Sequence, residues 1–126
     1  MYHVDIEHTQ DMVFSVRAKG KELLIDAKGS AMTPPDVLLA ALGSCVGVYL
    51  RKYAEGAKLD LANFTVSVEA EFSKEPPVGF KEIKVAVDLK GAVLDDRRKQ
   101  ALLTFVKNCP VHNTLKLNPT VDIVLH

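Results

Sequence analysis

The sequence has no surplus of either charge. Among its 126 residues, 16 are Lys or Arg and 16 are Asp or Glu, so the formal net charge is zero. A dedicated nucleic-acid-binding protein normally carries a basic surplus or a basic stripe. The balance therefore argues against that class, and we expect no nucleic-acid partner.

A long hydrophobic run is also lacking. The longest nearly apolar segment covers residues 37–50, whereas a membrane-spanning helix needs about 20 such residues. We therefore interpret this segment as a buried core helix and expect no membrane association. The chain does not open with a basic stretch followed by an apolar one, so no signal peptide is predicted. The expected location is the cytoplasm.

Cysteine is scarce, with only Cys45 and Cys109 present. Neither belongs to a Cys-x-x-Cys pair, and the four histidines are scattered, so the pattern argues against a metal site. The glycine motifs of phosphate-binding loops, dinucleotide-binding folds and serine hydrolases are absent too. A permanent disulfide is unusual in the cytoplasm. If the two thiols pair, we expect the bond to be made and broken during function.

The hydrophobic periodicity predicts an α+β protein with antiparallel strands and one single domain over residues 1–126. The residues 37–50 are apolar or small on every helical face, so we expect the helix that contains them to be buried all round. So short a chain cannot cover such a helix by itself, which predicts a homodimer. The expected order is strands over residues 2–7, 12–17 and 23–25, a helix over 34–55, strands over 64–72 and 80–89, a helix over 95–106, a short helix from 109, and a strand over 121–125.

The first helix has candidate signals at both ends. Thr33 or Asp36 can cap its start, where two prolines suit only the entry of a helix. Gly56 is the candidate for a left-handed stop. Within the helix, Gly43 and Gly47 flank Cys45, although glycine costs roughly 1 kcal/mol against alanine there. Close packing of another helix and access for a substrate are the two explanations.

Cys109 has the more telling local context of the two cysteines. Proline at position 110 suits the first turn of a helix, which makes Cys109 the expected N-cap and brings its sulfur near free amide N–H groups. This position favours the reactive thiolate, and His112 could add a charge or a hydrogen bond. Cys45 lies in apolar surroundings that would raise the pKa of its thiol. For both residues, a purely structural role as a small buried side chain stays open.

Two segments resemble the signatures of the OsmC/Ohr family. Residues 34–45, Pro-Pro-Asp-Val-Leu-Leu-Ala-Ala-Leu-Gly-Ser-Cys, are similar to its first signature, and residues 109–115, Cys-Pro-Val-His-Asn-Thr-Leu, resemble its second. The resemblance spans essentially the whole chain. It implies an intertwined homodimer of OsmC-like fold, with antiparallel sheets around a long central buried helix and two equivalent sites at the subunit interface.

The family resemblance also implies a chemistry. Its best-known members are thiol-dependent peroxidases that reduce organic hydroperoxides in the oxidative stress response. By that resemblance Cys45 attacks the peroxide, Cys109 resolves the sulfenic acid as a disulfide, and Arg17 is the candidate cation that activates Cys45. No bound cofactor or metal is expected, and an external dithiol is the expected reductant.

One position departs from the family pattern. Peroxidase members carry a glutamate ten residues before the first cysteine, where it orients the arginine, and this chain has Pro35 at that place. Asp36 is one residue further on, and one residue turns a helical side chain by about 100°. The alternative hypothesis is therefore a non-catalytic protein that binds a small apolar or electrophilic ligand near Cys45.

Overall fold

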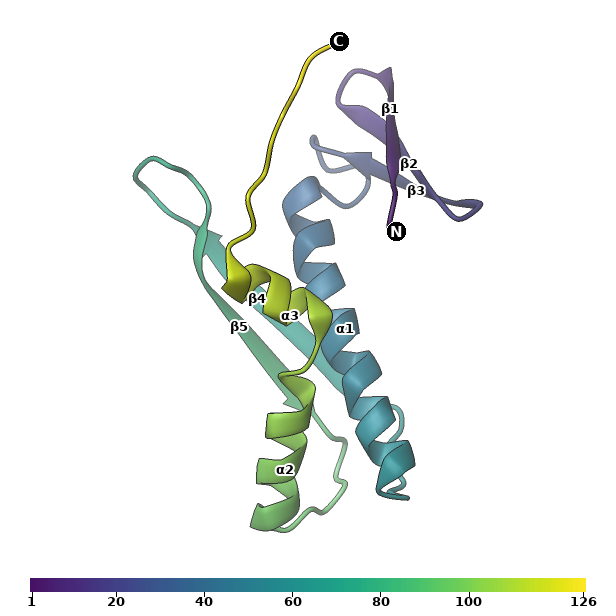
Figure 1. Cartoon of the computed structure of the whole chain (residues 1–126), viewed down its shortest axis with the longest axis vertical. Coiled ribbons are helices and arrows are strands. Elements are labelled where there is room, and N and C mark those ends of the chain that lie inside the picture. Colours follow the sequence, from purple (N-terminus) through teal and green to yellow (C-terminus); the bar gives the residue numbers. More distant parts are fainter. The chain divides into compact units, whose positions relative to one another are not determined.

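The computed structural model describes residues 1–126 and has two antiparallel sheets and three helices (Figure 1). The α+β class is thus confirmed. The chain forms two compact units, residues 1–40 and residues 41–126. The first unit contains the three-stranded sheet, and the second contains the two-stranded sheet and the C-terminal helices.

The first unit is built on a meander of three short strands. They are β1 (Asp5–Gln10), β2 (Val13–Ala18) and β3 (Lys21–Asp26), and β2 lies between the other two. Lys19 and Gly20 turn the chain between β2 and β3 with positive φ angles of 52° and 74°. This turn separates the two strands that the sequence predicts over residues 12–17 and 23–25.

Helix α1 (Pro34–Gly56) begins at a reciprocal cap. The Thr33 N–H donates to the Asp36 carboxylate at 3.0 Å, and the Asp36 N–H donates to the Thr33 hydroxyl at 3.4 Å. Thr33 is therefore the N-cap, and Asp36 completes the box from the third helical position. The hydrogen bonds from Thr33, the backbone one first, lower the pKa of Asp36.

The expectation that Gly56 ends α1 in a left-handed conformation is wrong. Gly56 belongs to the last helical turn, and the residue with positive φ is Lys58, at 55°. The chain reverses there because the Leu59 N–H donates to the Ala54 carbonyl at 2.8 Å. This bond closes the helix as a glycine cap would, two residues further along.

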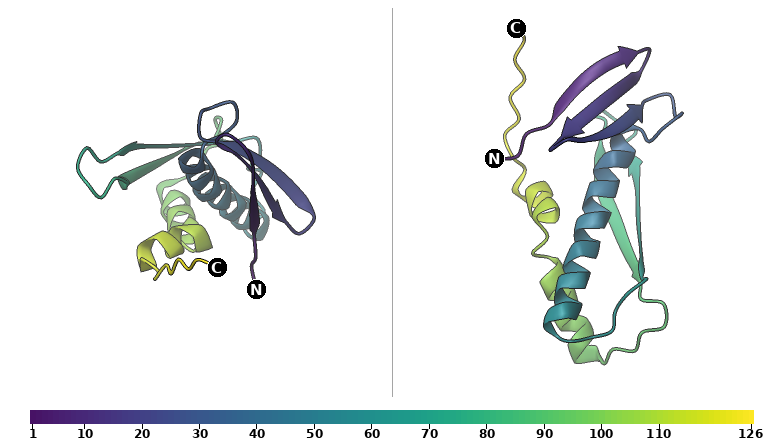
Figure 2. Two further views of the ribbon diagram at one scale, coloured as in Figure 1. Left: turned by 90° about the horizontal axis from the view of Figure 1, so that it is seen from above. Right: turned by 90° about the vertical axis from the view of Figure 1, so that its right-hand side faces the viewer.

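In the second unit α1 runs along the hairpin of β4 (Thr65–Phe72) and β5 (Phe80–Asp88), as Figure 2 shows. A Cβ atom at Gly43 would lie 2.7 Å from Val68 Cγ2, so glycine allows this close approach. The close packing expected at Gly43 is therefore present, but its partner is a strand and not another helix. The buried core of the chain consists of Leu42, Val46, Leu50, Ala54, Leu61, Leu102 and Cys109.

Helix α1 is buried on one side only within a single chain. Its buried residues recur every three to four positions, whereas Leu38 and Val48 are 42% and 51% exposed. The helix has 23 residues and is long and apolar enough to cross a membrane by those two criteria alone. One such helix is weak evidence for a membrane protein, because the core helix of a soluble protein passes the same test.

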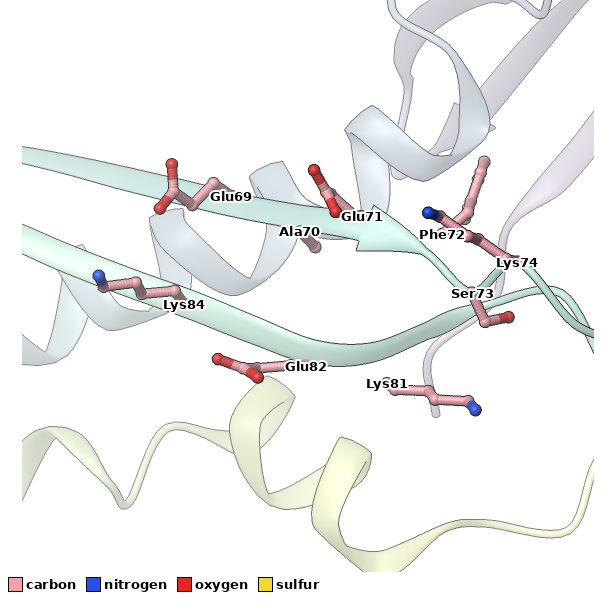
Figure 3. A pocket seen from close by; sticks show the side chains of 9 residues that line it. All are labelled: Glu69, Ala70, Glu71, Phe72, Ser73, Lys74, Lys81, Glu82 and Lys84. Atoms are coloured by element: carbon pink, nitrogen blue, oxygen red, sulfur yellow. The ribbon is translucent and has the colours of Figure 1, made fainter.

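The outer face of the hairpin is charged. Glu69 lies opposite Lys84 in the strand register, and both are exposed. They line an open depression whose charged side chains are three glutamates and three lysines (Figure 3). Glu69 and Glu71 are both exposed, and the mixed signs give this face no dominant charge.

The C-terminal end of the chain contains α2 (Asp96–Val106) and α3 (Pro110–Leu117), as the sequence predicts. The strand expected over residues 121–125 is absent, and Val121 and Leu125 are 76% and 97% exposed. A strand is stabilised by hydrogen bonds to a neighbour, and this segment has no such neighbour within the chain. The strand predicted for this segment is therefore wrong for the single chain.

Candidate functional site

The two cysteines meet at the start of α3. Cys109 is the N-cap of this helix, and its sulfur accepts a hydrogen bond from the His112 N–H at 3.5 Å. The side chain of Cys109 is fully buried, and that of Cys45, in the middle of α1, is half-buried. Both are free thiols. The structure thus confirms the expected N-cap and brings together two residues that are far apart in the sequence.

Two groups at the same helix end act on Cys45. The Cys109 side chain and the Val111 N–H lie close enough to its thiol to shift the pKa of Cys45. Pro110 has no N–H, so Val111 and His112 provide the first free amides of α3. The His112 amide donates to Cys109, and the Val111 amide acts on Cys45. The first turn of α3 therefore acts on both sulfurs.

The surroundings raise the pKa of the Cys45 thiol. Burial is the largest cause, because it disfavours the charged thiolate, and the hydrogen bond with Cys109 comes next. The Val111 amide and the charge of Lys52 act in the opposite direction. Burial and Cys109 together outweigh these opposing effects, so the surroundings in the single chain disfavour the Cys45 thiolate.

His112 takes part through its main chain. Its N–H donates to Cys109, while the Nδ1 atom of its ring is buried and has no hydrogen-bond partner within the chain. The sequence left open whether His112 adds a charge or a hydrogen bond. In the structure it adds a hydrogen bond, which its backbone N–H donates.

Arg17 lies on β2 in the first unit, whereas Cys45 belongs to the second. The guanidinium of Arg17 is paired with Glu7 and Glu22, at 3.7 Å and 3.8 Å. Its side chain is 59% exposed, and ion pairs this exposed contribute little to stability, about 0–1 kcal/mol each. Activation of Cys45 by Arg17 stays a prediction.

Sequence reasoning missed two contributors to the site, Val111 and Lys52. The Val111 amide could have been found, because it occupies the second position of a helix whose cap and first proline were recognised. Lys52 lies seven residues after Cys45 on the same helix, a spacing that returns almost to the same face. Neither position indicates by itself that the residue acts on the Cys45 thiol.

The second signature, residues 109–115, thus forms the helix start that holds both thiols. A family model described as OsmC-like protein matches residues 27–124, which is most of the chain. The chain belongs to the OsmC-like protein family. The match includes α1 and both cysteines, and it crosses the boundary between the two compact units. No curated protein matches the sequence.

Solved structures of the OsmC-like fold match 90–92% of the chain. A proposed osmotic stress and detoxification response protein from Psychrobacter arcticus 273-4 is 24% identical, with a TM-score of 0.80 over 90% of this chain and 88% of the other. The OsmC-like protein from Mycoplasma pneumoniae is 20% identical, with a TM-score of 0.79 over 92% and 87%. The organic hydroperoxide resistance protein OsmC from Legionella pneumophila is 19% identical, with a TM-score of 0.65 over 92% and 89%.

Proposed function

We propose that this chain is a thiol-dependent peroxidase that reduces organic hydroperoxides through Cys45 and Cys109. The observation that carries the proposal is the proximity of the two thiols at the start of α3, where Cys109 acts on the pKa of Cys45. A peroxidatic thiol needs a second thiol within reach, so that its oxidised form is captured before it is oxidised further. The hydroperoxide resistance proteins among the similar structures support the same chemistry.

The reaction has two steps within the chain. The Cys45 thiolate attacks one peroxide oxygen, the O–O bond breaks, and the alcohol leaves with a proton, so that Cys45 becomes a sulfenic acid. The Cys109 thiol then attacks the sulfenic sulfur, a disulfide forms, and water leaves. An external dithiol reduces the disulfide by thiol–disulfide exchange and restores both thiols. No bound cofactor takes part.

The proposal includes a homodimer in the cytoplasm. Support for the dimer comes from apolar side chains that a single chain leaves exposed, among them Leu38 and Val48 on α1 and Ile123 near the C-terminus. Because burial raises the pKa of Cys45, the first step also needs a nearby cation. Arg17 is the proposed cation, released from its weak pairs with glutamates.

The test is to add excess cumene hydroperoxide to the fully reduced protein and to analyse it by mass spectrometry without reductant. We expect an intrachain disulfide between Cys45 and Cys109, seen as the loss of two hydrogens and as one cross-linked peptide. Hydrogen peroxide at the same concentration should react more slowly, because apolar side chains surround Cys45. If both thiols stay reduced under excess cumene hydroperoxide, the proposed activity is wrong.

Matched variants separate the roles of the two cysteines. Cys45→Ser should abolish dithiol-dependent peroxide consumption and leave Cys109 unmodified. Cys109→Ser should form no disulfide and should accumulate the sulfenic acid of Cys45, trapped with dimedone, or its overoxidised forms. Arg17→Gln should slow the first step and leave disulfide reduction unchanged. Equal turnover in Cys45→Ser and the unmodified protein would contradict the assignment.

A second candidate function is a protein that binds a small apolar or electrophilic ligand near Cys45 without turnover. Pro35, at the place of the family's glutamate, and the raised pKa of the Cys45 thiol favour it. This function predicts thiols that do not respond to peroxide and an apolar ligand that co-purifies with the protein. A peroxidase rate that depends on an added dithiol would exclude it.

A further inference from the structure

We propose that Lys52 is a positioning residue for the Cys45 thiolate: its ammonium group, held over the Tyr49 ring on the same side of α1, stabilises the negative charge on the sulfur. The consequence of Lys52 for catalysis rests on the proposed function, whereas the effect of its charge on the ionisation of Cys45 does not. None of the sequence motifs points to this residue.

Helix geometry places Lys52 on the same side of α1 as Cys45. Seven residues make nearly two turns, so Lys52 lies about 20° around the helix and about 10 Å along it from Cys45. Helical side chains lean toward the N-terminus of their helix, which directs the long Lys52 side chain back toward the thiol. Tyr49, four residues after Cys45, lies between them.

Tyr49 holds the ammonium group of Lys52 in place. The Lys52 Nζ atom is 4.7 Å from the centroid of the Tyr49 ring, within the range of a cation–π contact. The Tyr49 ring itself packs against Phe105 of α2, with 5.8 Å between ring centroids. The contact favours conformations in which the exposed Lys52 side chain lies over a ring packed in the core, on the side of the thiol.

The charge of Lys52 acts on Cys45 against the effect of burial. The other groups that act on this thiol are Cys109 and the Val111 amide from α3, while β4 meets this part of α1 with valine side chains. Cys109 favours the protonated thiol, so Lys52 is the cationic side chain of the second unit that favours the thiolate. Its contribution adds to that of any further cation from the first unit.

The experiment measures the ionisation of Cys45 without peroxide. The reduced protein is alkylated with iodoacetamide over a range of pH, and the rate at Cys45 is followed by peptide mass spectrometry. Lys52→Gln removes the charge, Lys52→Glu reverses it, and Lys52→Arg retains it. Lys58→Gln and Lys58→Glu are matched controls, because Lys58 follows the same helix and does not act on Cys45.

We expect Lys52→Gln to raise the pKa of Cys45 by about 0.3–0.5 pH unit and to slow alkylation at neutral pH about 2- to 3-fold, as a partly screened charge at this separation would. Lys52→Glu should have about twice this effect, and Lys52→Arg almost none. Salt near 1 M, with a screening length of about 3 Å, should raise the pKa in the unmodified protein but not in Lys52→Gln.

The proposal is overturned if Lys52→Gln and Lys58→Gln give the same pKa, or if Lys52→Glu shifts it no more than Lys58→Glu. Alkylation in urea provides the unfolded reference, in which the pKa of Cys45 should be the same in all variants. A pKa that depends on Lys52 in a protein that consumes no peroxide would refute the peroxidase and retain this inference. A protein that reduces peroxide, but whose Cys45 pKa does not depend on Lys52, would refute this inference and retain the peroxidase.

Discussion

Gly43 is the position at which one added methyl group tests the packing of α1 on the hairpin. In Gly43→Ala the new Cβ would lie 2.7 Å from Val68 Cγ2 and 3.7 Å from Val66 Cγ1. The first distance is too short for two carbon atoms, which pack best at about 3.5–4.0 Å. Valine cannot move away freely, because its branched side chain has one preferred rotamer in most backbone settings.

Two opposing effects determine the change in the free energy of unfolding. Alanine is favoured over glycine inside a helix by about 1 kcal/mol. Forcing an extra methyl group into a packed core costs typically about 1–3 kcal/mol. Gly43→Ala should therefore be destabilising by up to about 2 kcal/mol. A change of this size is readily measured from the midpoint of urea unfolding followed by circular dichroism.

Gly47→Ala is the matched control on the same helix. Its Cβ would lie 3.7 Å from Phe64 Cε1 and 4.0 Å from Val66 Cγ2, which are ordinary contacts. Only the helix preference then applies, so Gly47→Ala should stabilise the protein by about 1 kcal/mol. Adding Val68→Ala to Gly43→Ala should recover part of the loss, seen as a favourable coupling in a double-mutant cycle. If Gly43→Ala stabilises the protein as much as Gly47→Ala, the close contact with Val68 is refuted.

Two further predictions concern titratable groups. Replacing Cys109 by Ala removes a hydrogen bond that favours the protonated form, so the pKa of Cys45 should fall, measured as faster alkylation of Cys45 at neutral pH; a rise would contradict this order of causes. Asp36→Ala removes a carboxylate whose pKa is lowered by hydrogen bonds from Thr33. The lowered pKa contributes to the stability of the folded chain above the unfolded pKa, near 3.9, and this contribution is lost as pH falls through the lower folded pKa. The thermal midpoints of Asp36→Ala and the unmodified protein should therefore differ at neutral pH and converge in acid, and a constant difference would disprove the linkage.

Local signals predicted the start of each helix well. The N-cap roles of Thr33 and Cys109 depend on a few neighbouring residues and on the prolines that follow them, so the sequence contains the necessary information. The end of α1 was less well predicted. Gly56 has the residue type of a left-handed stop, but Lys58 adopts that conformation, because the hydrogen bond to the Ala54 carbonyl matters more than the absence of a side chain.

The hydrophobic periodicity of the sequence could not predict which distant segments of the chain contact one another. Gly43 indicated a close approach, yet nothing local distinguishes a helix from a strand as its partner. The segment over residues 121–125 has the pattern of a strand, but a strand forms only where another backbone offers hydrogen bonds. The proximity of Cys45 and Cys109 also came from the family resemblance, since no periodic pattern connects positions so far apart.

Burial is the largest cause of the raised pKa of Cys45, and the arrangement that makes the redox pair possible adds to it. Cys109 must lie near Cys45 to resolve a sulfenic acid, and in that place it also favours the protonated Cys45 thiol. A low pKa and an adjacent resolving thiol therefore oppose each other here, and only added positive charge satisfies both. The Val111 amide and the charge of Lys52 lower the pKa of Cys45 in part, and the proposed peroxidase needs a further cation such as Arg17. Peroxide reactivity should accordingly rise with each cation added near Cys45.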